Sequence, residues 1–132
     1  ASGLIVPIGS FVLRQALQQA AAWREQGRAI RVAVNVSVVQ FRQPGFVDEV
    51  ASALAAVDLP GDWLEIELTE SILLRDASEA RERLEALARL GVRLSIDDFG
   101  TGYSSLGYLK QLPIHKLKID RSFIRGLPAD ER

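Results

Sequence analysis

Residues 64–70 of this 132-residue chain have the sequence Leu64-Glu65-Ile66-Glu67-Leu68-Thr69-Glu70. Apolar and polar residues alternate along this stretch, which predicts a β-strand with one apolar and one polar face. Asp76 and Glu79 then form a candidate capping box for a helix that runs to Leu90. A strand followed directly by a helix is the repeating unit of parallel α/β folds.

The same unit recurs on both sides of this stretch. The other expected helices span about Gly9–Gln26, Phe46–Val57 and Ser105–Gln111, and the other expected strands span Ile30–Ser37, Val92 to Asp97 or Asp98, and Lys116–Asp120. Alternation of strands and helices implies parallel strands joined by crossover helices. Because a complete (β/α)8 barrel needs roughly 250 residues, we expect a partial TIM-like barrel with about four parallel strands. A small open α/β sheet is the alternative.

The polar faces of the strands favour the barrel. Asn35, Glu67, Asp97 and Lys118 lie on these faces, toward the C-terminal ends of their strands. A doubly wound sheet is covered on both faces, so its strands are continuously hydrophobic. An antiparallel sheet with one wet face would alternate in the same way, but it does not explain why acids and amides gather at strand C-termini. Barrel enzymes carry their active sites at that end.

The composition narrows the possible functions. The chain is 48% hydrophobic and 25% charged with a formal net charge of -1, so it can build a core and has no strong field that would attract nucleic acid polymers or an anionic membrane. Without cysteine it has no disulfides, zinc–thiolate sites or cysteine nucleophiles. We find no membrane segment in this chain and expect a cytoplasmic protein, which leaves membrane attachment of a parent protein open. The absence of methionine favours a fragment of a longer protein.

The strand-end residues point to metal chemistry. Asn35, Glu67, Asp97 and Asp98 offer hard oxygen ligands, which favour Mg²⁺ or Mn²⁺. Asp97 is placed to bridge two ions, and Asp98, although of opposite parity, lies where the chain turns and can reach the second. Two ions roughly 3.5–4 Å apart activate water and stabilise an in-line displacement at phosphorus, and a lysine such as Lys118 would hold the attacking hydroxide. A single acid at a strand end is more often a helix cap or a surface ion-pair partner, Lys118 alone a salt-bridge partner, and Asn35 alone a turn amide. Together, at strand ends of one polarity, these residues predict a site.

Neighbouring residues have less specific signals. Glu70 has the opposite parity to Glu67, which favours hydrogen bonds to the following loops over metal binding. The Gly/Ser-rich segment 99–105, which contains Ser104, is suited to lie over phosphates or to form a lid. Asp98-Phe99-Gly100 matches the kinase metal triplet, but the chain lacks a glycine-rich nucleotide loop and a His-Arg-Asp segment, so we reject a kinase. We interpret His115 as a solvated loop residue.

Four segments together resemble the EAL domain family. They are Asn35-Val36-Ser37, Glu67-Leu68-Thr69-Glu70-Ser71, Asp97-Asp98-Phe99-Gly100-Thr101-Gly102-Tyr103-Ser104-Ser105-Leu106 and Lys118-Ile119-Asp120. The resemblance covers essentially the whole chain, in order.

This resemblance implies a barrel that hydrolyses cyclic di-GMP to linear pGpG with two Mg²⁺ or Mn²⁺ ions in bacterial second-messenger signalling. It implies that Asn35, Glu67 and Asp97 bind the first metal and that Asp97 and Asp98 bind the second. Lys118 would position the catalytic water, so that the implied catalytic residues are Lys118, Asp97 and Glu67. The remaining implied roles are loop anchoring for Glu70 and substrate binding for Ser104 and Asp120.

The family's Glu-Ala-Leu strand would precede residue 1, and its last barrel strands would follow residue 132. We therefore expect residues 1–132 to be a truncated EAL domain, with an active parent enzyme and an inactive fragment. The alternative is a non-catalytic module that binds cyclic di-GMP or another protein. Open barrel edges predict a homodimer, and the resemblance implies GGDEF or sensory domains in the parent.

Overall fold

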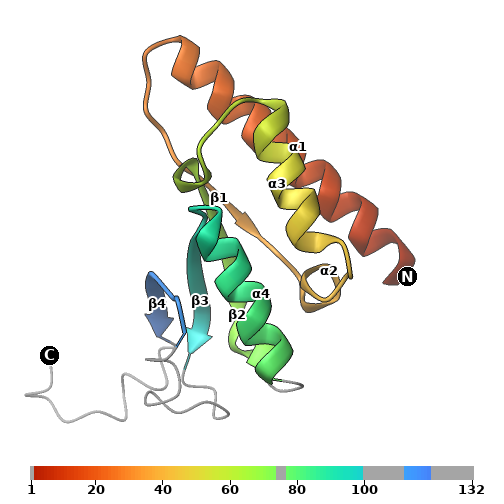
Figure 1. The fold of residues 1–132 in the computed structure, drawn as a ribbon. Coiled ribbons are helices and arrows are strands. Elements are labelled where there is room, and N and C mark those ends of the chain that lie inside the picture. The colour runs from red at the N-terminus through yellow and green to blue at the C-terminus, as the bar shows by residue number, and fades with distance from the viewer. Residues whose placement is uncertain (1, 74–76, 100–111, 120–132) are drawn as a thin grey trace, which may run out of the picture.

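The computed structural model describes residues 2–73, 77–99 and 112–119 (Figure 1). A four-stranded parallel sheet has the order β1-β2-β3-β4, so each strand pairs with the next one along the chain. The elements are α1 (Ser2–Glu25), β1 (Val32–Asn35), α2 (Val38–Phe41), α3 (Phe46–Ala56), β2 (Leu64–Thr69), α4 (Ala77–Arg89), β3 (Arg93–Phe99) and β4 (Lys116–Ile119), with 3-10 turns at Gly61–Trp63 and Glu70–Leu73. The predicted α/β class with parallel strands and crossover helices is confirmed.

Helices α1, α3 and α4 lie on one side of the sheet (Figure 1). The apolar strand residues face them, and Ile66, Leu94 and Ile96 are completely buried there. The helices contribute apolar stripes, which include the buried side chains Leu13, Leu17, Phe46, Val50, Leu84 and Leu87. Full burial of such a side chain stabilises the fold by about 1.5–3 kcal/mol. The apolar face of the sheet is therefore covered by helices, and its polar face carries the candidate site.

Several predicted boundaries near the N-terminus are wrong, including the start of β1, which is Val32 rather than Ile30. Helix α1 begins at Ser2 rather than near Gly9 and contains Pro7. Proline removes one backbone hydrogen bond, but the buried stripe farther along the helix outweighs this loss. Strand β1 ends at Asn35 rather than at Ser37, because the Ser37 hydroxyl accepts a hydrogen bond of 3.0 Å from Gln40 N and caps α2. The sequence had not predicted α2.

The later boundaries shift by one or two residues. Strand β2 ends at Thr69, and β3 runs from Arg93 to Phe99. Helix α4 ends at Arg89, and Gly91 follows it with a φ of 90°, in the left-handed region that glycine favours. The predicted capping residue Asp76 and the predicted helix 105–111 lie outside the described residues. Within the ranges that the structure covers, no helix has both the length and the apolar character needed to cross a membrane.

Gly61 lies where the turn before β2 touches the turn before β3. A Cβ at this position would overlap the backbone carbonyl of Leu90, which cannot swing aside as a side chain would. We expect Gly61→Ala to lower the free energy of unfolding by about 2–3 kcal/mol through this overlap. Gly45 provides the control, because a Cβ there meets no atom within 4 Å. Urea unfolding of both variants measures the effect, and equal stability of the two would contradict the close packing of these turns.

Candidate active site

Asn35 and Glu67 are neighbours on the polar face of the sheet. They are register partners of β1 and β2, and Glu67 is in turn the partner of Ser95 in β3. Partners in adjacent parallel strands lie about 4.8 Å apart and point to the same face. Asn35 is exposed and Glu67 is half-buried. The side chains of Asn35 and Glu67 therefore leave the backbone at neighbouring positions near the C-terminal end of the sheet.

Asp97 lies one step farther along the same face. It pairs with Thr69, two residues beyond Glu67, and is half-buried. The register between β3 and β4 then shifts, because Ile96 pairs with Leu117 whereas Phe99 pairs with Ile119.

This shift places two residues of β3, Asp97 and Asp98, opposite the single residue Lys118 of β4. Such a bulge kinks a strand and re-aims side chains, and bulges are common beside active sites. Strict alternation would send the two aspartates to opposite faces of the sheet. The bulge interrupts that alternation at Asp97 and Asp98, the two residues that are predicted to share a metal ion.

Further polar side chains of the same face are those of Glu65, Ser95 and Lys116. The Nζ of Lys116 lies 3.5 Å from Oε2 of Glu65, whose side chain is only 8% exposed. The Ser95 side chain between these strands is fully buried, and its Oγ has no hydrogen-bond partner in the described part of the chain. Because Lys116 already compensates the buried Glu65 carboxylate, Lys118 is the lysine of β4 that remains for a site at the C-terminal end.

The donor set fits a hard divalent cation. Asn35, Glu67 and Asp97 offer only oxygen ligands, on exposed or half-buried side chains that face away from the helical core. No group of three or more His, Cys, Asp or Glu side chains that could hold a metal is found within residues 2–73, 77–99 and 112–119. Asn35 is not one of these residue types, and only the backbone is described for Asp98, Glu70 and Lys118. Ser104 and Asp120 lie outside the described residues.

His115 has a structural role that the sequence analysis did not predict. The residue is exposed as expected, but its Nδ1 accepts a hydrogen bond of 3.0 Å from the backbone N–H of Leu94. Its own backbone N–H donates to Leu94 O at 2.8 Å. These two bonds hold the start of β4 against β3, and Lys118 follows three residues later. No local pattern in the sequence indicates a contact between residues 21 positions apart.

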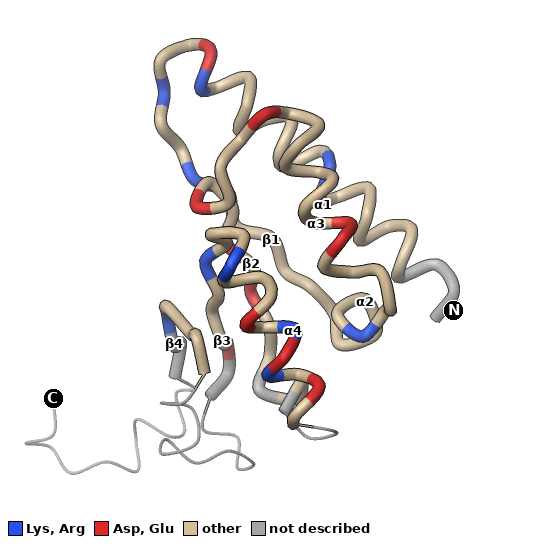
Figure 2. Tube along the Cα trace, in the orientation of Figure 1, with Lys and Arg blue, Asp and Glu red and all other residues tan. Residues whose placement is uncertain are grey.

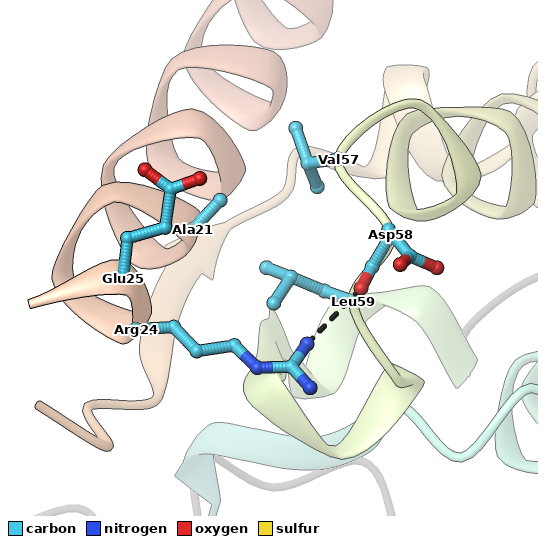
Figure 3. A pocket seen from close by; sticks show the side chains of 6 residues that line it. All are labelled: Ala21, Arg24, Glu25, Val57, Asp58 and Leu59. Carbon is cyan, nitrogen blue, oxygen red and sulfur yellow. Dashed lines mark hydrogen bonds between the residues drawn. The ribbon is translucent and has the colours of Figure 1, made fainter. Parts of the chain in front are cut away.

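Two surface hollows lie away from these side chains. One is lined by Ala29, Arg31, Asp62 and Trp63, just before β1 and β2 begin. Another lies between the C-terminal ends of α1 and α3, where an Arg24 nitrogen donates to the carbonyl oxygen of Asp58 at 3.1 Å (Figure 3). Both belong to the end of the sheet opposite the strand C-termini, so neither is part of the candidate site.

The model of the EAL domain family matches residues 1–132. The chain belongs to the EAL domain family. Among curated EAL-containing relatives, the bifunctional diguanylate cyclase/cyclic di-GMP phosphodiesterase MucR of Pseudomonas aeruginosa is 50% identical over 130 residues, which are 98% of this chain and 19% of that protein. The cyclic di-GMP phosphodiesterase PdeR of Escherichia coli is 37% identical over 126 residues, 96% of this chain and 19% of that protein.

Solved EAL structures have the same fold. The PaMucR phosphodiesterase in complex with c-di-GMP matches with a TM-score of 0.84 and 49% identity, over 98% of this chain and 56% of that one. The EAL domain of Mycobacterium smegmatis DcpA matches with a TM-score of 0.79 and 44% identity, over 92% of this chain and 55% of that one. This chain therefore spans about half of each of these two solved chains, and the predicted partial barrel is confirmed.

Proposed function

We propose that this chain is the central part of an EAL phosphodiesterase domain that hydrolyses cyclic di-GMP to linear pGpG in bacterial second-messenger signalling. The observation that carries the proposal is the strand register, which brings Asn35, Glu67, Asp97 and Lys118 to one end of the polar face. The names of the relatives MucR and PdeR support the same activity. In the reaction, water adds at one phosphorus, the bond from that phosphorus to the 3′ oxygen breaks, and the 3′ oxygen leaves as a hydroxyl.

We propose that Asn35, Glu67 and Asp97 hold a first Mg²⁺ or Mn²⁺ and that Asp97 and Asp98 hold a second. The bulge that sets Asp97 and Asp98 opposite Lys118 supports this sharing. Bound divalent cations would supply an activated water and charge stabilisation at the phosphoryl oxygens.

Lys118 orients the attacking water in this proposal. Its register position is opposite the two aspartates, and an ammonium donor suits a developing hydroxide. Lys116, the other lysine of β4, forms an ion pair with Glu65 and is therefore not proposed to contact the water. Glu70 anchors the loop that follows β3, and Ser104 and Asp120 contact the substrate. These last three roles rest on the family resemblance.

The chain is much shorter than its curated relatives, and this affects which protein the proposed activity belongs to. It spans between 15% and 22% of the curated relatives' lengths, so the activity proposed here is that of the complete protein. We propose that residues 1–132 alone do not hydrolyse cyclic di-GMP, because the family's other metal-binding carboxylates lie on strands that these residues do not contain. A homodimer through open barrel edges, GGDEF or sensory domains in the parent, and a cytoplasmic location remain predictions.

The test is an assay of the complete protein with cyclic di-GMP, with the products separated by chromatography and identified by mass. We expect linear pGpG in the presence of Mn²⁺, loss of turnover with EDTA, and recovery when Mn²⁺ is restored. Tight binding of cyclic di-GMP without product at any metal concentration would instead support the non-catalytic alternative.

A further inference from the structure

Arg83 of α4 joins that helix to the loop that follows α2. Its Nη1 donates to the backbone carbonyls of Phe41 at 2.7 Å and Gln43 at 2.6 Å. Its Nη2 lies 3.3 Å from Oε1 of Glu79, one turn earlier on the same helix, and the Arg83 side chain is only 18% exposed. One half-buried guanidinium therefore closes a contact between segments about 40 residues apart in the sequence.

Arg83 differs from the other charged residues of α4. This helix carries basic and acidic residues in alternation (Figure 2). Arg81 forms an ordinary helical pair with Glu85 at 3.3 Å, with both side chains more than 40% exposed. Pairs of that kind contribute little to stability. Arg83 instead satisfies two carbonyl oxygens of another segment, which a surface ion pair does not do.

The segment that Arg83 holds is packed on its other side against α1. Gln40 of α2 is buried, and a Cβ on Gly9 would overlap its carboxamide, so α1 and α2 are in close contact there. The Gln40 Nε2 has no hydrogen-bond partner among residues 2–73, 77–99 and 112–119. The contact with α1 is therefore steric, whereas the contact with α4 supplies directional hydrogen bonds.

Only a few residues separate this segment from the candidate site. Asn35 is followed by Val36, whose N–H donates to the Glu67 carbonyl at 3.0 Å, and by Ser37, which caps α2. The chain has no freely rotating stretch between the Asn35 backbone and the carbonyls that Arg83 holds. A displacement of α2 would therefore be transmitted to Asn35.

We propose that Arg83 is a positioning residue, which fixes the Asn35 carboxamide by holding the α2 turn through the carbonyls of Phe41 and Gln43. The metal-binding consequence rests on the proposed function, whereas the effect on Asn35 itself does not. Outer partners that orient a metal ligand are worth about 10- to 100-fold in metal affinity. Arg83 acts here through the backbone that follows Asn35 and is not proposed to contact the substrate.

The experiment compares Arg83→Ala, Arg83→Lys and Arg81→Ala in the complete protein. Asn35 is the only asparagine of residues 1–132. In the complete protein, selective ¹⁵N-asparagine labelling identifies its side-chain amide pair as the one that Asn35→Ala removes from the spectrum. We expect Arg83→Ala to shift that pair in metal-free protein and to raise the Kd for Mn²⁺ about 10-fold. Arg83→Lys should have a smaller effect, because a point charge does not reproduce the forked donor. Arg81→Ala should change neither readout.

Two results distinguish a failure of the positioning proposal from a failure of the proposed metal site. If Arg83→Ala lowers the melting temperature but leaves the Asn35 amide signals unchanged, Arg83 is a structural clamp only and the proposal is overturned. If Asn35→Ala leaves the Kd for Mn²⁺ unchanged, the proposed metal site is wrong. The Asn35 amide signals of the Arg83 variants still decide the positioning role in that case.

Discussion

Asp97→Ala is expected to lower kcat/KM for cyclic di-GMP by at least about 10²-fold in the complete protein. Asp97 belongs to the β3 bulge and pairs with Thr69, two residues beyond Glu67, and in the proposed site it is the ligand common to both ions. Loss of an outer partner of a metal ligand costs about 10- to 100-fold, and loss of a shared ligand should cost more. The rate of steady-state hydrolysis should fall, and the Kd for Mn²⁺ should rise.

Asp48→Ala is the matched control for this variant. Asp48 is an exposed aspartate in the first turn of α3, on the helical side of the sheet. We expect turnover within about twofold of the unmodified protein, because surface substitutions of this kind usually change stability by less than about 0.5 kcal/mol. Unchanged turnover in Asp97→Ala would contradict the mechanism.

Lys118→Met should separate catalysis from metal binding. Removal of a single donor aimed at developing charge typically costs about 10²–10³ in kcat. Lys118 is proposed to orient the water and is not proposed as a metal ligand, so the Kd for Mn²⁺ should be unchanged. Measurement of kcat and of Mn²⁺ binding on the same preparation tests both statements.

Lys116→Met provides the comparison within the same strand. Lys116 lies two residues earlier and pairs with the buried Glu65. This variant should unfold at lower urea concentration, because a buried carboxylate loses its partner, but the folded molecules should keep their turnover. The assignment of Lys118 would be wrong if Lys116→Met lost as much kcat as Lys118→Met.

Alternation in the strands was enough to predict the fold class and which face of the sheet carries the polar residues of the candidate site. The apolar residues of β2 and β3 are buried under helices, and Glu67 and Asp97 lie on the other face, as their parity predicts. These features depend only on a period of two residues and on burial, so they are visible locally. The four-strand parallel order follows from the strand–helix rhythm for the same reason.

Features that depend on long-range contacts were not predictable. The bulge at Asp97 and Asp98 exists only relative to β4, and the His115 contact depends on Leu94. Arg83 has the sequence context of an ordinary surface arginine, and its two carbonyl partners become visible only when α4 is placed beside α2. Periodicity gives the face of a residue, whereas register and contact partners require the three-dimensional structure.

The most direct test is anomalous diffraction from crystals of the complete protein soaked with Mn²⁺. The central claim is that the C-terminal ends of β1, β2 and β3 form one metal site. We predict an anomalous peak about 2.1 Å from oxygen atoms of Asn35, Glu67 and Asp97, and a second peak beside Asp97 and Asp98. Ordered Mn²⁺ bound elsewhere, with these side chains uncoordinated, would contradict it.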